Sequence, residues 1–135
     1  MPSDAQSSAQ GMDESVVQDS MQIILHAGNA RTIACKALEI SAAGDTSRAR
    51  ELVEEAHKEL LKAHHIHTDR IQSEAAGNSQ GFTLLFAHAQ DTLMTITSEI
   101  SLTKRLVDAF DIYNSRIDRL EAELAELMEG KENRC

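Results

Sequence analysis

The sequence is poor in the residues that build β-rich folds. It has no tryptophan, one tyrosine and three phenylalanines in 135 residues, with only one proline and six glycines. A β-sandwich or β-barrel needs many turns and many β-branched or aromatic side chains, so the composition excludes these architectures. Strong helix formers such as Ala, Leu, Glu and Gln are abundant instead. The composition therefore predicts an all-α fold.

What is missing also argues against several functional classes. Acidic residues outnumber basic ones by 22 to 13, and a net charge of −9 would repel a phosphate backbone, so we expect no nucleic-acid partner. No run of about 18 apolar residues is present, so no membrane-spanning helix is expected. Cys35 and Cys135 are too few for a disulfide framework, and the polar start of the chain lacks the pattern of a signal peptide. We therefore expect a cytoplasmic protein.

Capping residues and glycines divide the chain into three expected helices. They run over about 13–43, 45–76 and 82–130, with Asp13 as a candidate N-cap. The short loop after Gly77 makes the second and third helices antiparallel neighbours. The expected core stripes of the first two helices are spaced mostly by three and four residues. They are Val17, Met21, Ile24, Ala27, Ala34 and Leu38, then Leu52, Ala56, Leu60, Ala63, His67 and Ile71.

The third helix is too long for a compact three-helix core. Its second half carries a heptad pattern with alternating steps of four and three residues. We call these positions the seam: Leu106, Phe110, Tyr113, Ile117, Leu120, Leu124 and Leu127. We expect a disordered tail at 1–12, a three-helix antiparallel bundle at 13–113 and a coiled-coil-like extension at 114–135. An apolar seam that extends beyond the bundle predicts self-association.

Histidines are the candidates for chemistry near neutral pH. His64, His65 and His67 form a cluster, but without further ligands at zinc-site spacing they are best interpreted as polar residues at the rim of the bundle. His88 lies between Ala87 and Ala89 on the third helix, where its imidazole is open to attack phosphorus or an acyl carbon. Judged by its neighbours alone, a buried structural histidine is the commoner interpretation.

Three blocks of the sequence together resemble a known family. They are His88-Ala89-Gln90-Asp91-Thr92-Leu93-Met94, Gly28-Asn29-Ala30-Arg31 and Ala63-His64-His65-Ile66. In this order the blocks resemble the enzyme IIA component of the lactose/cellobiose (N,N'-diacetylchitobiose) branch of the bacterial phosphoenolpyruvate-dependent sugar phosphotransferase system. The resemblance extends over roughly residues 14 to 113.

The resemblance implies a role for each matching position. His88 matches the histidine that receives a phosphoryl group on Nε2 from the phosphocarrier HPr and passes it to a cysteine of the IIB component. Gln90 matches a glutamine near that imidazole, a hydrogen-bond donor to the phosphoryl oxygens. Asp91 matches an aspartate on the axis of a homotrimer, where three copies share a metal ion, usually Mg²⁺. The membrane would then be reached only through the sugar permease.

Two positions and the extension depart from the family pattern. Thr92 replaces a second histidine one turn beyond His88, and His67 replaces a glutamine and is expected to approach the site. The leading hypothesis is a phosphocarrier in the uptake of a β-linked disaccharide of the lactose, cellobiose or chitobiose type. A regulatory or scaffolding paralogue of the same fold, without a transport role, is the alternative, and a purely structural helical trimer ranks last.

Overall fold

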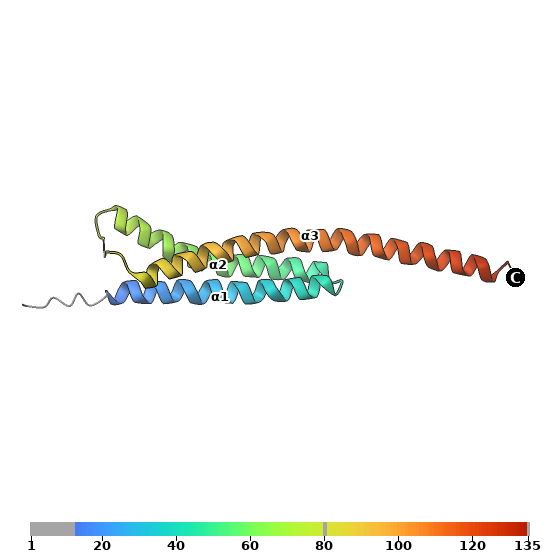
Figure 1. Cartoon of the computed structure of the whole chain (residues 1–135), viewed down its shortest axis with the longest axis horizontal. Coiled ribbons are helices and arrows are strands. Elements are labelled where there is room, and N and C mark those ends of the chain that lie inside the picture. Colours follow the sequence, from blue (N-terminus) through green and yellow to red (C-terminus); the bar gives the residue numbers. More distant parts are fainter. Residues whose placement is uncertain (1–12, 80, 135) are drawn as a thin grey trace, which may run out of the picture.

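The computed structural model describes residues 13–79 and 81–134, and this part of the chain is entirely helical, without strands. Helix α1 spans Glu14–Ala42, α2 spans Thr46–Ala75 and α3 spans Leu84–Glu132. The helices run up, down and up, and α3 continues far beyond the ends of the other two (Figure 1). The three-helix bundle expected from the sequence is confirmed, whereas the expected tail at 1–12 lies outside the described residues.

Side chains and glycines fix the helix ends, and the N-cap at Asp13 and the glycines after the first two helices are those that the sequence predicts. The Asp13 carboxylate accepts a hydrogen bond from the Ser15 N–H, and the Thr83 hydroxyl accepts one from the Phe86 N–H. These bonds satisfy backbone donors that have no partner within the first turn. Gly44 and Gly77 follow α1 and α2 with φ of 105° and 98°, a backbone conformation that residues other than glycine rarely adopt.

The core stripe of α1 is displaced from the predicted one by about one residue. Ala27 and Ala34 are buried as expected, but Met21 is 52% exposed and Val17, Ile24 and Leu38 are only partly buried. The buried face consists mainly of small side chains: Val16, Ser20, Ile23, Ala27, Ala30, Ala34, Ala37 and Ser41. The prediction failed because it followed large apolar residues, whereas alanine and serine allow neighbouring helices to approach closely.

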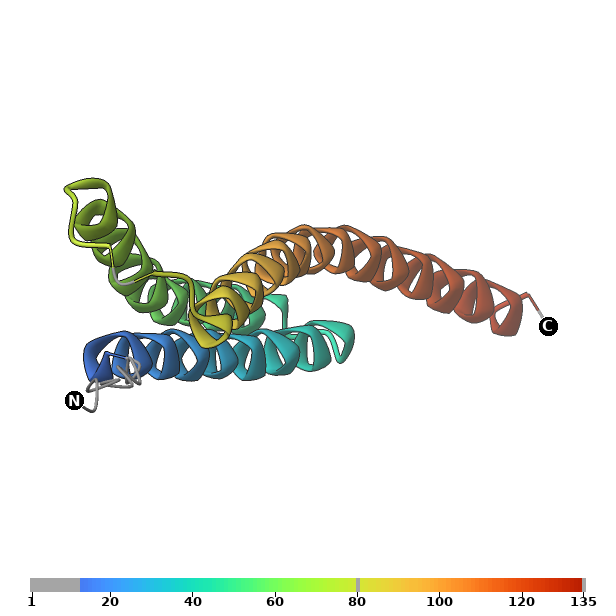
Figure 2. The same ribbon diagram turned by 60° about the vertical axis from the view of Figure 1, so that its left-hand side comes forward.

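The stripe of α2 is correct over its first two thirds. Leu52, Ala56, Leu60 and Ala63 are buried, but Ile71 is 41% exposed, which corrects the prediction. The last turns of α2 diverge from the start of α3 (Figure 2). Arg70 in these turns still pairs with Asp19 of α1, whereas Ile71 is left largely uncovered.

Helix α3 leaves the bundle at residue 114. Near this point Asp111 accepts hydrogen bonds from Thr46 and Arg50, and the Asn114 amide donates one to the Ser41 carbonyl. Every residue at 115–134 is exposed, and the seam side chains at Ile117, Leu120, Leu124 and Leu127 are 50–68% exposed. We call residues 115–134 the stalk. At 1.5 Å per residue it extends about 30 Å beyond the bundle.

Candidate functional site

The predicted nucleophile, His88, lies in the second turn of α3 and is exposed. The next residue, Ala89, is fully buried in the core, so the helix is packed against its neighbours at the point where His88 projects into solvent. Thr92 follows one turn later, on the same side of the helix, and is partly buried. The imidazole is therefore accessible from solvent, as a nucleophile that meets a protein donor requires, and the interpretation of His88 as a buried structural histidine is wrong.

Asp91 and Gln90 are also exposed, but they leave the helix in different directions. Residues three apart share a side of an α-helix, whereas residues two apart do not. The structure therefore brings Asp91 onto the side of His88, and it does not bring Gln90 beside the imidazole within one chain. A hydrogen bond from Gln90 to a group on His88 would need a second copy of the chain.

Large apolar side chains are exposed near the start of α3. Phe82 is 85% exposed and Leu84 is 78% exposed, whereas Phe86 is partly buried and packs on the core. Exposed side chains of this size next to a reactive group are typical of protein-docking surfaces. Two large apolar side chains are therefore open to solvent at the His88 end of the bundle.

The sequence block at Gly28–Arg31 supports the helix that carries His88. The Arg31 guanidinium donates two hydrogen bonds, of 2.7 and 2.8 Å, to the two carboxylate oxygens of Glu99. This bidentate pair raises the pKa of Arg31 and joins α1 to α3 about three turns beyond His88. Both side chains are nearly half exposed, so the pair contributes orientation more than stability.

The histidines of the second block have structural contacts. His67 stacks on Phe86, with ring centroids 5.8 Å apart and an interplanar angle of 13°. Phe86 leaves α3 in a different direction from His88, so the structure places His67 against the core and not beside His88 as expected. Its Nε2 atom is buried and has no hydrogen-bond partner among the described residues.

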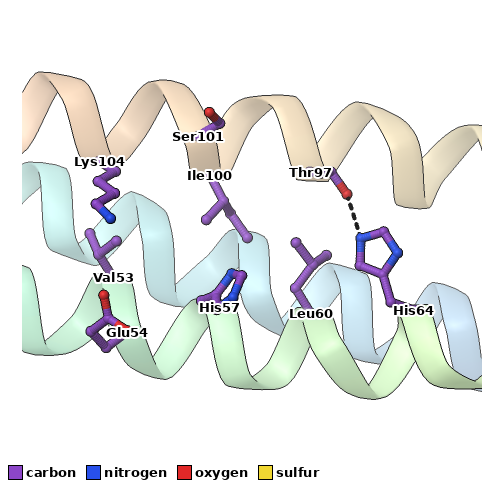
Figure 3. A pocket seen from close by; sticks show the side chains of 9 residues that line it. All are labelled: Val53, Glu54, His57, Leu60, His64, Thr97, Ile100, Ser101 and Lys104. Atoms are coloured by element: carbon purple, nitrogen blue, oxygen red, sulfur yellow. Dashed lines mark hydrogen bonds between the residues drawn. The ribbon is translucent and has the colours of Figure 1, made fainter.

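A cavity of about 330 Å³ lies between α2 and α3, with His57, Leu60 and His64 on one side and Thr97 and Ile100 on the other (Figure 3). The Thr97 hydroxyl donates to the Leu93 carbonyl, so at 3.1 Å it accepts a hydrogen bond from Nε2–H of His64. Burial, reinforced by the neighbouring histidines, lowers the pKa of His64 and favours the neutral ring. At about 100° per residue, Thr97 points away from the His88 side of α3, so this cavity is separate from the His88 site.

His26 has an acidic partner that sequence spacing does not reveal. Its Nδ1 lies 2.6 Å from a carboxylate oxygen of Glu59, which is 33 positions away on α2. This hydrogen bond and a second one from Lys62 lower the pKa of Glu59 to about 2. The pair lies between α1 and α2 and has a structural role.

No group of three or more His, Cys, Asp or Glu side chains within the described part of one chain could hold a metal ion. Asp91 supplies a single carboxylate. Oxygen ligands of this type suit Mg²⁺, but one carboxylate is too few to hold the ion. A metal site at Asp91 therefore requires several copies of the chain.

Comparisons with known proteins agree with the geometry. The family model of the PTS system lactose/cellobiose-specific IIA subunit matches residues 18–111. The lichenan-specific phosphotransferase enzyme IIA component of Bacillus subtilis is 39% identical over 100 residues, which cover 74% of this chain and 91% of the relative. The PTS system lactose-specific EIIA component of Lacticaseibacillus casei is 36% identical over 108 residues, which cover 80% of this chain and 93% of that protein.

A solved structure shows the same likeness. The crystal structure of the PTS cellobiose-specific enzyme IIA from Bacillus anthracis matches with a TM-score of 0.69 and 35% sequence identity. The match covers 73% of this chain and 90% of the Bacillus anthracis chain. The family match ends at residue 111, so the stalk lies beyond it.

Proposed function

The chain belongs to the lactose/cellobiose-specific IIA family of the sugar phosphotransferase system, and from this membership we propose that it is a phosphohistidine carrier. It accepts a phosphoryl group from phospho-HPr on His88 and passes it to a IIB component during sugar uptake. The observation that carries the proposal is the exposed His88 on a helix whose neighbouring residue, Ala89, is fixed in the core.

In the proposed reaction, neutral Nε2 of His88 attacks the phosphorus atom of phospho-HPr in line with the bond that breaks. The new P–N bond forms on His88 as the old one breaks, and the imidazole of HPr leaves with the bonding electron pair. The second transfer reverses these roles, with a cysteine thiolate of IIB as the nucleophile. Since donor and acceptor imidazoles are chemically alike, the first transfer is nearly balanced, and catalysis consists mainly of positioning.

The exposed apolar side chains at the His88 end support the docking of two successive partners. Phe82 and Leu84 provide apolar contact area within a few residues of the nucleophile. HPr and IIB must each bind and leave, so a small patch fits the task better than an extensive interface. This docking role is part of the proposal.

We also propose that the active form is a homotrimer with Asp91 of each copy on the axis. Three carboxylates close together repel one another unless a cation lies between them. Asp91 of the three copies would hold the ion, which when bound supplies positive charge that offsets this repulsion. Trimerisation would also bring Gln90 of one copy within reach of His88 of another.

The names of the relatives indicate the sugar class. They specify lichenan, lactose and cellobiose, and one specifies oligo-β-mannoside. We therefore propose a β-linked disaccharide of the lactose, cellobiose or chitobiose type as the transported sugar. The carrier would act in the cytoplasm and reach the membrane only through its permease; no described helix is apolar and long enough to cross a bilayer.

The test is to incubate the protein with phosphoenolpyruvate, enzyme I and HPr and to measure its intact mass. We expect the gain of one acid-labile phosphoryl group in the wild type and none in His88→Ala. His65→Ala is the matched control, because His65 is an exposed histidine on α2 and should leave the gain unchanged. Phosphorylation of His88→Ala would overturn the assignment of His88.

Two observations favour the alternative of a regulatory or scaffolding paralogue. The stalk lies outside the family match, and Thr92 stands where the resemblance leads us to expect a second histidine. If the chain is phosphorylated by HPr but does not transfer the group to any IIB component, the regulatory function replaces the transport function.

A further inference from the structure

The stalk is an α-helix with an apolar stripe and no neighbour in the described chain. All its residues are exposed, and Leu120, Leu124 and Leu127 are 62%, 57% and 68% exposed. In proteins most of the stability of a helix comes from packing of its apolar face, and the stalk has no such packing within the described chain. An exposed apolar stripe on it indicates a surface that another chain covers.

The stripe continues the side of α3 that carries Asp91. Asp91, Leu102, Tyr113 and Leu124 follow one another at intervals of 11 residues, and 11 residues make about three turns of an α-helix. At about 100° per residue these four side chains fall within about 60° of one another. Leu102 and Tyr113 are 57% and 56% exposed, so the face is open along its whole length.

The face buried in the bundle is a different one. It consists of Ala89, Leu93, Ile96, Ile100, Thr103 and Val107. Continued into the stalk, this face reaches Asn114 and Glu121, which are polar. The apolar stripe of the stalk is therefore directed away from α1 and α2 of its own chain, and its own bundle is not the partner.

Charges flanking the seam fit a second copy in parallel. In heptad terms Arg116 is at position g and Glu121 at position e, the two positions that pair between parallel helices. Neither residue has an oppositely charged residue three or four positions away in its own helix. A parallel copy in register would give each of them an opposite charge.

We propose that the stalks of three copies form a parallel, in-register coiled coil that continues the trimer axis from Asp91 to Leu127. The proposal rests on the trimer of the proposed function and extends it beyond the family match. The coiled coil covers the exposed seam and holds the three α3 helices together at the end opposite His88. It thereby leaves the His88 end free for HPr and IIB.

The first test measures hydrogen exchange of the stalk amides. The seam variant is Leu120→Asp/Leu124→Asp, and the matched control is Ala122→Asp/Ala125→Asp, which places the same charges in the same turns on the opposite side of the helix. We expect exchange at 115–132 to be at least about tenfold faster in the seam variant than in the wild type or the control. Equal exchange in the two double variants would overturn the coiled coil, whatever the oligomeric state of the bundle.

Sedimentation equilibrium of the wild type separates this failure from that of the proposed function. If the mass is that of a trimer and exchange is equal in both variants, the coiled coil of the stalk is contradicted and the proposed phosphocarrier trimer is retained. A dimer or monomer mass overturns the three-copy assembly, while phosphorylation of His88 is decided by its own mass measurement. All substituted side chains are exposed, so the bundle should fold in every variant.

The second test determines the direction of the helices. In a Cys35→Ser/Cys135→Ser background, Leu127→Cys should form a disulfide between two copies under mild oxidation, because parallel seams place position 127 of each copy together. Ala122→Cys, on the far side of the helix, is the control and should remain reduced. Absence of cross-linking at Leu127→Cys, or equal cross-linking at both positions, would overturn the parallel register.

Discussion

The two parts of α3 space their apolar side chains in the same way, but one part is packed against other helices and the other is exposed to solvent. At 84–114 the stripe of Leu93, Ile96 and Ile100 is covered by α1 and α2 and is at most 4% exposed. At 115–132 the seam has the same steps of three and four residues, yet its side chains are at least half exposed. Periodicity therefore identifies which face of a helix needs a partner, but not whether the partner belongs to the same chain.

The strongest test of this comparison substitutes one residue in each part. Ile96→Ala removes a fully buried side chain from the core and should lower the free energy of unfolding by about 2–5 kcal/mol. Leu120→Ala should change the unfolding of a dilute, dissociated subunit by less than about 1 kcal/mol, since Leu120 is 62% exposed. Urea unfolding followed by circular dichroism measures both.

Protein concentration separates the two effects further. The loss in Ile96→Ala should be the same at low and high protein concentration, because its contacts are within one chain. The loss in Leu120→Ala should grow with concentration, because association of the stalks then contributes to wild-type stability. A loss in Leu120→Ala as large as that in Ile96→Ala at high dilution would contradict the distinction.

Acid should destabilise the bundle part through Glu59. Hydrogen bonds from His26 and Lys62 lower its pKa from 4.5 to about 2. A carboxylate with a lowered pKa in the folded state contributes stability that is fully present above about pH 4.5 and is lost as the pH falls toward 2. At about 1.4 kcal/mol per pKa unit, Glu59→Gln should cost up to about 3 kcal/mol at pH 7.

Thermal unfolding between pH 2 and 7 measures this dependence. The wild type should lose stability over the acid range, and Glu59→Gln should lose less because the carboxylate is already gone. Glu123→Gln is the control, since Glu123 is on the exposed stalk and makes no ion pair within the described residues. If both variants lost stability with the same pH profile as the wild type, the His26–Glu59 contact would not contribute.

Local signals in the sequence were sufficient for the helices but not for all of their contacts. Asp13 caps α1 as predicted because capping depends on residues within one turn. The core stripe of α1 was misplaced because Ala30, Ala37 and other small side chains carry little hydrophobic signal, although they are fully buried. How closely two helices approach depends on the side chains of both, so the pattern of one helix alone does not predict it.

The same limit applies to the candidate site. His88 is exposed, as a role as nucleophile requires. This placement follows from local sequence, because the apolar residues next to His88 on the helix determine which side of the helix faces the core. The contact of His26 with Glu59 joins positions 33 apart, and the stacking of His67 on Phe86 depends on how α2 meets α3. The roles of Gln90 and Asp91 depend on other copies of the chain, so they stay predictions.

The smallest expected effect concerns the charges beside the seam. Arg116→Glu should weaken self-association by about two- to fivefold for each of the three interfaces of the trimer at low salt, because one exposed ion pair contributes at most about 1 kcal/mol. The double variant Arg116→Glu/Glu121→Arg should restore the affinity, since the charges are exchanged but still opposite.

Arg119→Glu is the control, as this residue lies on the side of the stalk away from the seam. Sedimentation at low salt and near 1 M salt measures the difference, which should vanish where the Debye length is about 3 Å. An equal loss in Arg119→Glu, or no rescue in the double variant, would show that net charge and not pairing across the seam sets the association of the stalk.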